Sequence, residues 1–304
     1  MKLRFLGVLL AVLFIGVATL LVISTATEGK TSILSKCVAL IELKGEISTS
    51  SSNAFGQATA SVEAISQQLK EAEENPQMTS IVLLVNSPGG SAVASKELHD
   101  EVKSVKKPII AYFSESAASG GYYVAAASNY IVANPNTITG SIGARASILN
   151  YEGLFGKVGL KEEAFKSGEL KDIGAGYRNL TDKERQLLDE MVMETFENFE
   201  KDVREARKGK LTAFFEEVLD GRILTAKNAL KAGLIDEIGT RKKAVEKAAS
   251  LANSASTQIC KMETPRSLSE LLSSLSSNAA NTFALQIQKQ LTQPSITQVR
   301  MEYS

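Results

Sequence analysis

An uninterrupted apolar segment opens the chain. Residues Phe5 to Ile23 carry no charged side chain, and Lys2 and Arg4 precede them. As a helix, this segment would be roughly 28 Å long, about the thickness of the hydrocarbon core of a bilayer. Flanking positive charges stay on the cytoplasmic side, so the pattern predicts a membrane anchor at residues 1–27 with the rest of the chain outside the cytoplasm. Because Ser24 and Ala26 are small enough for a signal-peptidase site, a cleaved signal peptide is the alternative.

Beyond residue 36, short apolar runs alternate with segments of helical period. The runs that predict strands are Cys37–Leu43, Ile81–Val85, Pro108–Phe113 and Tyr130–Ala133. The segments between them with helical periodicity are 58–75, 93–105 and 120–128. Continuous apolar runs are typical of strands covered on both faces, and their alternation with helices predicts βαβ units around a mostly parallel sheet. The polar segment from Gly45 to Gln57 predicts a loop.

A long amphipathic helix is predicted from Thr181 to Lys208. Thr181 and Glu184 have the spacing of a capping box at its start. Apolar residues recur every three or four positions and form one stripe: Leu188, Met191, Val192, Phe196, Phe199 and Val203. Such a stripe is typical of a helix that faces the core, and packing against a second subunit is the alternative.

These elements form a single α/β domain, which we place at residues 37–250 and join to the anchor through a polar linker at 28–36. Residues 251–304 are rich in Ser, Asn, Gln and Thr, with room for one short helix. We expect an appended and partly disordered tail there.

Composition removes several classes of function. Lys plus Arg and Asp plus Glu both number 34, so the net charge is zero and the basic face of a nucleic-acid binder is not expected. With a single histidine, the chain has no zinc-protease motif of two histidines. Its two cysteines, Cys37 and Cys260, form neither a disulfide framework nor a zinc site. Outside the cytoplasm they could be oxidised, although nothing in the sequence pairs them.

Three small-residue turns lie where a predicted strand gives way to a new element. The first is Asn86-Ser-Pro-Gly-Gly90, whose glycines allow close approach of the backbone to a ligand and leave N–H groups to stabilise an oxyanion. The second surrounds Ser119, an exposed position suited to a nucleophile, with the N–H of Gly120 beside it. The third, Thr139-Gly-Ser-Ile-Gly143, offers the hydroxyl of Ser141. Each alone is more often a plain turn.

Taken in this order and at these intervals, the turns resemble the signal peptide peptidase A family. The matching segments are Asn-Ser-Pro-Gly-Gly, Ala-Ser-Gly-Gly-Tyr-Tyr, Gly-Ser-Ile-Gly and the stretch from Asp220 to Asp236. The resemblance covers about residues 37–250 and fits the short, single-domain form. It implies a Clp-protease/crotonase-like fold, a membrane-bound serine peptidase and assembly into a ring in which a neighbouring subunit can complete the active site.

The resemblance also implies which residue acts as the base. His99 precedes Ser119, whereas a Clp-type histidine follows the serine, and we expect His99 to be a solvated helix residue. The family uses a lysine in a Ser-Gly-x-x-Lys-Asp context, which here is Ser167-Gly-Glu-Leu-Lys171-Asp172. The resemblance therefore implies a dyad of Ser119 and Lys171, with Ser141 holding the lysine and an oxyanion hole of Gly120 with Gly89 or Gly90. Burial disfavours the charged form of a lysine, which is how such a base becomes neutral.

We therefore expect an endopeptidase that uses no metal or cofactor and cleaves signal-peptide remnants or other apolar, membrane-associated peptides. Three alternatives stay open at this point. They are a Ser/Lys protease dedicated to one membrane protein, as in stomatin-associated relatives, a crotonase-like acyl-CoA enzyme, and a non-enzymatic membrane scaffold.

Overall fold

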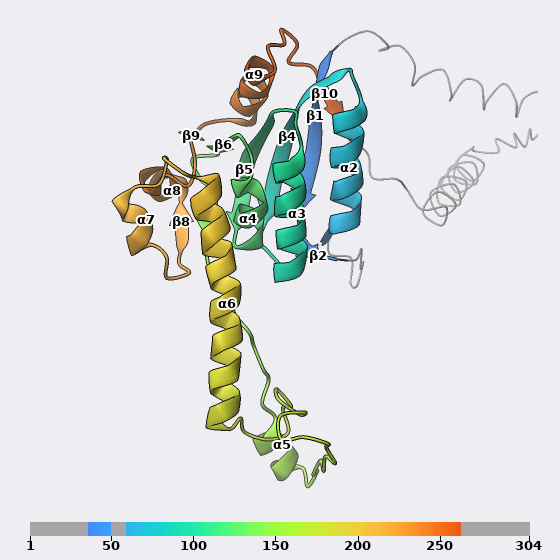
Figure 1. The fold of residues 1–304 in the computed structure, drawn as a ribbon, viewed down its shortest axis with the longest axis vertical. Coiled ribbons are helices and arrows are strands. Elements are labelled where there is room, and N and C mark those ends of the chain that lie inside the picture. The colour runs from blue at the N-terminus through green and yellow to red at the C-terminus, as the bar shows by residue number, and fades with distance from the viewer. Residues whose placement is uncertain (1–35, 50–58, 263–304) are drawn as a thin grey trace, which may run out of the picture. The chain divides into compact units, whose positions relative to one another are not determined.

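The computed structural model describes residues 36–49 and 59–262 (Figure 1). The expected anchor at 1–27, almost all of the linker, and the tail beyond Met262 lie outside these residues. Within the described ranges, no helix is both long enough and apolar enough to cross a membrane.

Eight strands of the described chain form one sheet in the order β10-β1-β4-β5-β6-β9, with β7 beside β5 and β8 beside β7. All neighbouring strands run parallel except β7 and β8. The strands are β1 (Cys37–Lys44), β4 (Met78–Ser87), β5 (Ile109–Ala118), β6 (Tyr130–Ala133), β7 (Ile138–Gly140), β8 (Ile223–Thr225), β9 (Glu237–Ile238) and β10 (Ile259–Lys261). The mixed α/β fold with a mostly parallel sheet is thus confirmed.

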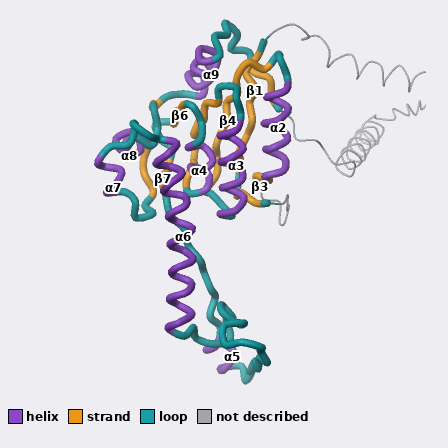
Figure 2. The backbone as a smooth tube through the Cα atoms, in the orientation of Figure 1, coloured by secondary structure: helices purple, strands orange, loops and turns teal. Residues whose placement is uncertain are grey.

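Helices cover both faces of this sheet. On one face lie α2 (Val62–Glu74), α3 (Ala92–Ser104) and α4 (Gly120–Ala126), with α2 and α3 running alongside the strands in Figure 2. On the other face, α9 (Arg241–Leu251) packs its alanines against Val38, Leu40 and neighbouring strand residues. Successive residues of β1 thus alternate between two apolar layers, which explains why its first five residues, Cys37–Ile41, are all apolar.

The expected loop at Gly45–Gln57 is wrong in its first part. Residues Glu46–Ser48 form β2, which pairs in parallel with β3 (Thr59–Ser61). Ile47 is buried and forms a β-bridge with Gly90. A single apolar residue among polar neighbours gave no periodic signal for so short a strand.

The long helix α6 (Asp182–Ala206) begins at the predicted capping box, with reciprocal bonds between Thr181 and Glu184. Its stripe is only partly core. Phe199 and Val203 are buried, whereas Met191 is 57% exposed. Leu188, Val192 and Phe196 are intermediate. The first half of the stripe therefore lacks a core to face within the described chain.

The chain between β7 and α6 differs from the rest. We call residues 145–184 the distal segment; it contains α5 (Glu152–Lys157) and lies at the N-terminal end of α6 (Figure 1). Only Gly176 and Glu184 are buried in it. Its exposed large apolar side chains are Ile148, Leu149, Leu154, Val158, Leu160 and Phe165.

After α6 the chain returns to the sheet through α7 (Ala213–Glu217) and α8 (Ala226–Ala232). The guanidinium of Arg207 is buried there and bonds to Asp236 and the carbonyl of Gly233. Strand β10, beyond residue 250, lies against β1, and a disulfide joins Cys37 to Cys260 with their Cα atoms 5.9 Å apart. The sequence left this pairing open.

Candidate active site

Ser119 is the residue between β5 and α4, where the strand turns into the helix. Its φ is +51°, a sparsely populated conformation for a residue with a side chain. Its N–H donates to the carbonyl of Gly140 at 2.8 Å. The side chain is half-buried. The strained turn thus presents the hydroxyl at the carboxyl end of the sheet.

Gly89 packs directly against this turn. A Cβ at Gly89 would lie 2.8 Å from the nitrogen of Gly120 and 2.9 Å from the Cβ of Ser119, and its φ is +108°. Only glycine fits there. The N–H of Gly89, however, already donates to Ser87 Oγ at 3.2 Å.

Within the part of the chain that the structure describes, two other N–H groups near Ser119 have no such partner. No hydrogen bond of the Gly90 N–H is found within the described ranges. The two residues that flank Gly90 bond to Ile47: Gly89 accepts from the Ile47 N–H, and Ser91 donates to the Ile47 carbonyl. Gly120 is the first residue of α4, so its N–H has no acceptor within the helix. The geometry therefore favours Gly90 over Gly89 as the partner of Gly120 in an oxyanion hole.

Ser141 lies beside Ser119 through the pairing of β5 with β7. Ala118 pairs with Gly140, the residue before Ser141. Ser141 also has a φ of +51°, and its N–H donates to the carbonyl of Arg222 at 2.8 Å. The fold thus brings together Ser119, Gly89, Gly90, Gly120 and Ser141, although they come from three separate turns.

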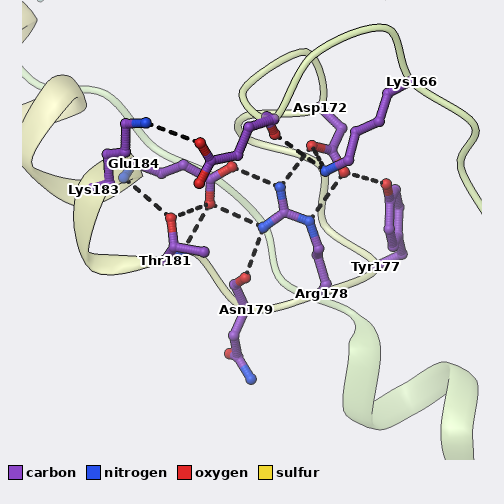
Figure 3. A network of polar contacts seen from close by, with 9 residues as sticks. Lys166, Asp172, Tyr177, Arg178, Asn179, Thr181, Lys183 and Glu184 are labelled. Carbon is purple, nitrogen blue, oxygen red and sulfur yellow. Dashed lines mark hydrogen bonds and ion pairs between the residues drawn. The ribbon is translucent and has the colours of Figure 1, made fainter.

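Lys171 lies elsewhere. It is exposed in the distal segment, and the carboxylate of its neighbour Asp172 is bridged by Arg178 to Glu184 at the start of α6 (Figure 3). Ser119 lies near the other end of α6, where the ring of Tyr123 stacks on Phe199 with ring centroids 4.3 Å apart. Glu184 and Phe199 are separated by 199 − 184 = 15 residues of α6, which is roughly 22 Å along the helix axis. A single chain therefore does not bring Lys171 to Ser119.

The expectation of a solvated His99 is wrong. The side chain is 1% exposed, and its Nδ1 lies 2.8 Å from the carbonyl oxygen of Tyr123. Burial lowers the pKa of His99. The face of α3 that carries His99 is covered by α4 and α6. The helical periodicity of α3 alone could not predict this contact with later elements of the chain.

A polar cluster surrounds this histidine. Asp202 of α6 accepts from the Tyr123 hydroxyl at 2.5 Å, and Lys96 binds both Asp100 and Asp202. Burial raises the pKa of the Tyr123 hydroxyl, and the bond to Asp202 adds to the effect. Ligand atoms of His99, Asp100 and Asp202 lie within 4.8 Å of one another. The Lys96 ammonium already pairs with the two carboxylates and neutralises part of their charge. The cluster is therefore better explained as a set of polar contacts that joins α3, α4 and α6 than as a cation site.

The chain is similar to known families of peptidases. The model of peptidase family S49 matches residues 101–255, just over half of the chain, and the Clp protease model matches residues 46–139. A proposed protease, MJ0651, of Methanocaldococcus jannaschii is 38% identical over 193 residues, which are 63% of this chain and 62% of that protein. A proposed signal peptide peptidase, SppA, of Enterococcus faecium is 35% identical over 226 residues, 73% of this chain and 64% of that protein.

Among solved structures, a mutant of the 1510-N membrane-bound stomatin-specific protease is 19% identical, with a TM-score of 0.49, and the match covers 76% of this chain and 99% of that one. The matches to the two relatives above span slightly less than two thirds of those proteins' lengths. On the match to its family model, the chain belongs to peptidase family S49.

Proposed function

We propose that this protein is a membrane-anchored serine endopeptidase with a Ser119/Lys171 dyad, which degrades signal-peptide remnants and other membrane-associated peptides. The observation that carries the proposal is the turn at Ser119. There, a half-buried hydroxyl on a strained backbone lies beside the Gly120 N–H and against Gly89. Membership of a peptidase family supports reading this turn as a nucleophile.

The proposed mechanism follows from these groups. Neutral Lys171 accepts the proton of the Ser119 hydroxyl while the oxygen attacks the scissile carbonyl. The N–H groups of Gly90 and Gly120 donate to the resulting oxyanion. Lys171 then protonates the leaving amine and afterwards activates the water that hydrolyses the acyl-enzyme. Ser141 orients the lysine from the turn next to Ser119.

The dyad is proposed to form between subunits. The separation along α6 leaves Lys171 too far from the serine of its own chain. The distal segment and the first half of α6 carry exposed apolar side chains, including Phe165 at 98% and Met191 at 57%. Scattered apolar residues are ordinary on a surface, but this many on one segment favours contact with a second copy. A ring of subunits would bury them and bring each Lys171 to the Ser119 of a neighbour.

The proposed location is the cell membrane, with the catalytic domain on the extracytoplasmic side. The charge-free segment from Phe5 to Ile23 supports the anchor. The disulfide between Cys37 and Cys260 supports the side, because disulfides are rare in the reducing cytosol of most organisms and persist outside it.

The test is peptide cleavage by single variants. Ser119→Ala and Lys171→Ala should each lower kcat by roughly 10⁴-fold or more and leave the far-UV circular dichroism unchanged. Ser128→Ala, beyond the far end of α4, is the matched control, because the buried Ser128 hydroxyl has no hydrogen-bond partner among the described residues and its removal should change little. Labelling by a fluorophosphonate should vanish in Ser119→Ala. Turnover near that of the wild type in either dyad variant would overturn the proposal.

A further inference from the structure

Ser87 is the last residue of β4 and lies directly before the glycine turn beside Ser119. Its side chain is fully buried, and its Oγ accepts from the N–H of Gly89 at 3.2 Å. Pro88 lies between these two residues, and its ring fixes its own φ. The chain is therefore held up to the N–H of Gly89 by a rigid ring and by one hydrogen bond to a side chain.

Gly89 is the residue of this turn that most needs such support. Its φ is +108°, and without a side chain its backbone has more freedom than that of other residues. On its other side the chain is held by β2, because the Gly89 carbonyl accepts from the Ile47 N–H at 2.9 Å. The peptide bond that follows is trans, so its N–H, which belongs to Gly90, points away from Ile47.

Two hydrogen bonds thus hold two successive peptide groups of one turn. The bond to Ser87 Oγ fixes the peptide group that contains the Gly89 N–H. The bond from Ile47 fixes the next peptide group, which contains the Gly90 N–H. Because the first bond occupies the Gly89 N–H, the Gly90 N–H is the donor that this turn leaves for a ligand within the described chain. Its direction depends on both bonds.

Ser87 also contacts the helix that carries the second donor. A Cβ at Gly121 would lie 2.8 Å from the Ser87 carbonyl oxygen and 3.1 Å from the Ser87 Cβ. Gly121 directly follows Gly120 in the first turn of α4. Ser87 is itself held from β5, since its carbonyl accepts from the Ser116 hydroxyl at 3.4 Å. One buried residue therefore touches both the glycine turn and the start of α4.

We propose that Ser87 is a positioning residue: its hydroxyl holds the glycine turn so that the Gly90 N–H can stabilise an oxyanion at Ser119. This inference rests on the proposed role of Ser119 as the nucleophile and is independent of the base. Ser87 does not touch the substrate. It acts through the backbone on an interaction that strengthens as the oxyanion forms, so it should affect kcat more than KM.

The first experiment measures cleavage of an internally quenched peptide, with leucine and alanine around its cleavage site, by the full-length protein. Ser87→Ala keeps the Cβ that packs on Gly121 and removes only the hydroxyl. It should lower kcat by about 10- to 100-fold, somewhat less than the loss of a whole oxyanion-hole donor. KM should change by less than about twofold. An unchanged kcat would overturn the inference.

Ser80→Ala is the matched control. Ser80 lies on the same strand and is as fully buried as Ser87, and its hydroxyl has no hydrogen-bond partner among the described residues. Its removal should leave kcat and KM at their wild-type values. Titration of Ser119 with a fluorophosphonate counts the active sites, so that unfolded protein does not lower kcat. A loss in Ser80→Ala equal to that in Ser87→Ala would mean that any such change in β4 lowers activity, and it would overturn the inference.

A second experiment tests the oxyanion hole directly. A boronic acid on the same peptide forms a tetrahedral adduct with a reactive serine, in which one oxygen takes the place of the oxyanion. In Ser87→Ala its Ki should rise by the factor by which kcat/KM falls, because such an analogue loses what the transition state loses. The same peptide with a carboxamide instead should bind the wild type and the variant equally. An unchanged Ki for the boronic acid, or equal weakening of both ligands, would contradict the inference.

Two further outcomes are distinguishable. If Ser87→Ala does not fold, Ser87→Cys decides, since its thiol is a weak acceptor: a lower kcat at constant KM supports the inference, and a wild-type kcat overturns it. If Ser119→Ala keeps its turnover, the proposed nucleophile is wrong, and the inference is wrong with it. An inactive Ser119→Ala together with a fully active Ser87→Ala removes the inference alone and leaves the proposed function intact.

Discussion

The sheet region and the distal segment each hold one half of the proposed dyad, and they hold it by different forces. Ser119 follows a strand buried on both faces, and only a glycine fits at position 89, where the backbone packs against the turn. Lys171 lies in a segment that is almost entirely exposed and is fixed by ion pairs around Arg178. A nucleophile with its oxyanion hole has to be prepositioned within one chain. A base that is delivered to a neighbour needs a surface that the partner can cover.

The largest difference between the two regions should appear when one phenylalanine in each is replaced by alanine. Phe113 of β5 is fully buried and packs edge-on against Tyr122, whereas Phe165 of the distal segment is 98% exposed. Phe113→Ala should lower the free energy of unfolding by about 3–5 kcal/mol because it leaves a cavity. Phe165→Ala should change it by less than about 0.5 kcal/mol in the monomer. Urea denaturation of dilute protein measures both. A large loss in Phe165→Ala would mean that the distal segment has a core of its own.

The disulfide should come next and should act on the sheet region alone. Reducing the bond between Cys37 and Cys260 should lower the free energy of unfolding by about 2–4 kcal/mol, since it releases a long closed loop in the unfolded chain. Hydrogen exchange should then increase in β1 and β10 and stay constant at residues 166–184. The double variant Cys37→Ser/Cys260→Ser, which cannot respond to reductant, is the control. Faster exchange confined to the distal segment would contradict the prediction that the disulfide stabilises the sheet region alone.

His99 provides a smaller, pH-dependent effect in the sheet region. Burial lowers the pKa of this side chain in the folded protein, whereas the unfolded chain binds a proton near pH 6.5. Stability is therefore fully present above about pH 6.5 and decreases below it, by at most about 1.4 kcal/mol per pH unit. Thermal unfolding between pH 7.5 and 5.5 should show this decrease in the wild type. An identical decrease in His99→Gln would show that other groups cause it.

The smallest effect should be local loosening of the distal segment in acid. The bonds from Arg178 lower the pKa of Glu184 to about 2 and also lower the pKa of Asp172, so their contribution is present above about pH 4.5. It is lost as the pH falls towards 2 and the carboxylates take up protons. Hydrogen exchange at residues 166–184, corrected for the intrinsic rate, should increase between pH 5 and 3 relative to the sheet. Arg178→Gln should exchange rapidly at both pH values, and protection in that variant equal to the wild type would contradict this role of the bonds from Arg178.

Much of the sheet region could be predicted from sequence because the apolar pattern of each strand there agrees with its buried position in the fold. The largely apolar runs at residues 37–43, 81–85, 108–113 and 130–133 became β1, β4, β5 and β6, since strands buried on both faces need apolar side chains at nearly every position. The turns at Ser119 and Ser141 were visible as small residues after those strands. The two turns are adjacent because β5 pairs with β7. The order of the elements along the chain does not predict that pairing.

The remaining features depend on contacts between distant residues. Strands β7 to β10 are two to three residues long, too short for periodicity to mark them. The burial of His99 arises from α4 and α6, and the pairing of Cys37 with Cys260 arises from the docking of β10 on β1. Of the residues bonded to Arg178, one had a role that could be predicted from the sequence, the capping-box glutamate Glu184. It could not reveal that the same carboxylate also receives a guanidinium.

The disulfide encloses nearly the whole domain in a covalent ring. Every residue from Cys37 to Cys260 lies within it, including both serines of the site, Lys171 and the exposed distal segment. A single cut in that segment, by this enzyme or by another protease, would therefore produce two fragments that stay linked. On a non-reducing gel such a nicked chain migrates as one species, and only reductant separates the half that carries Ser119 from the half that contains Cys260.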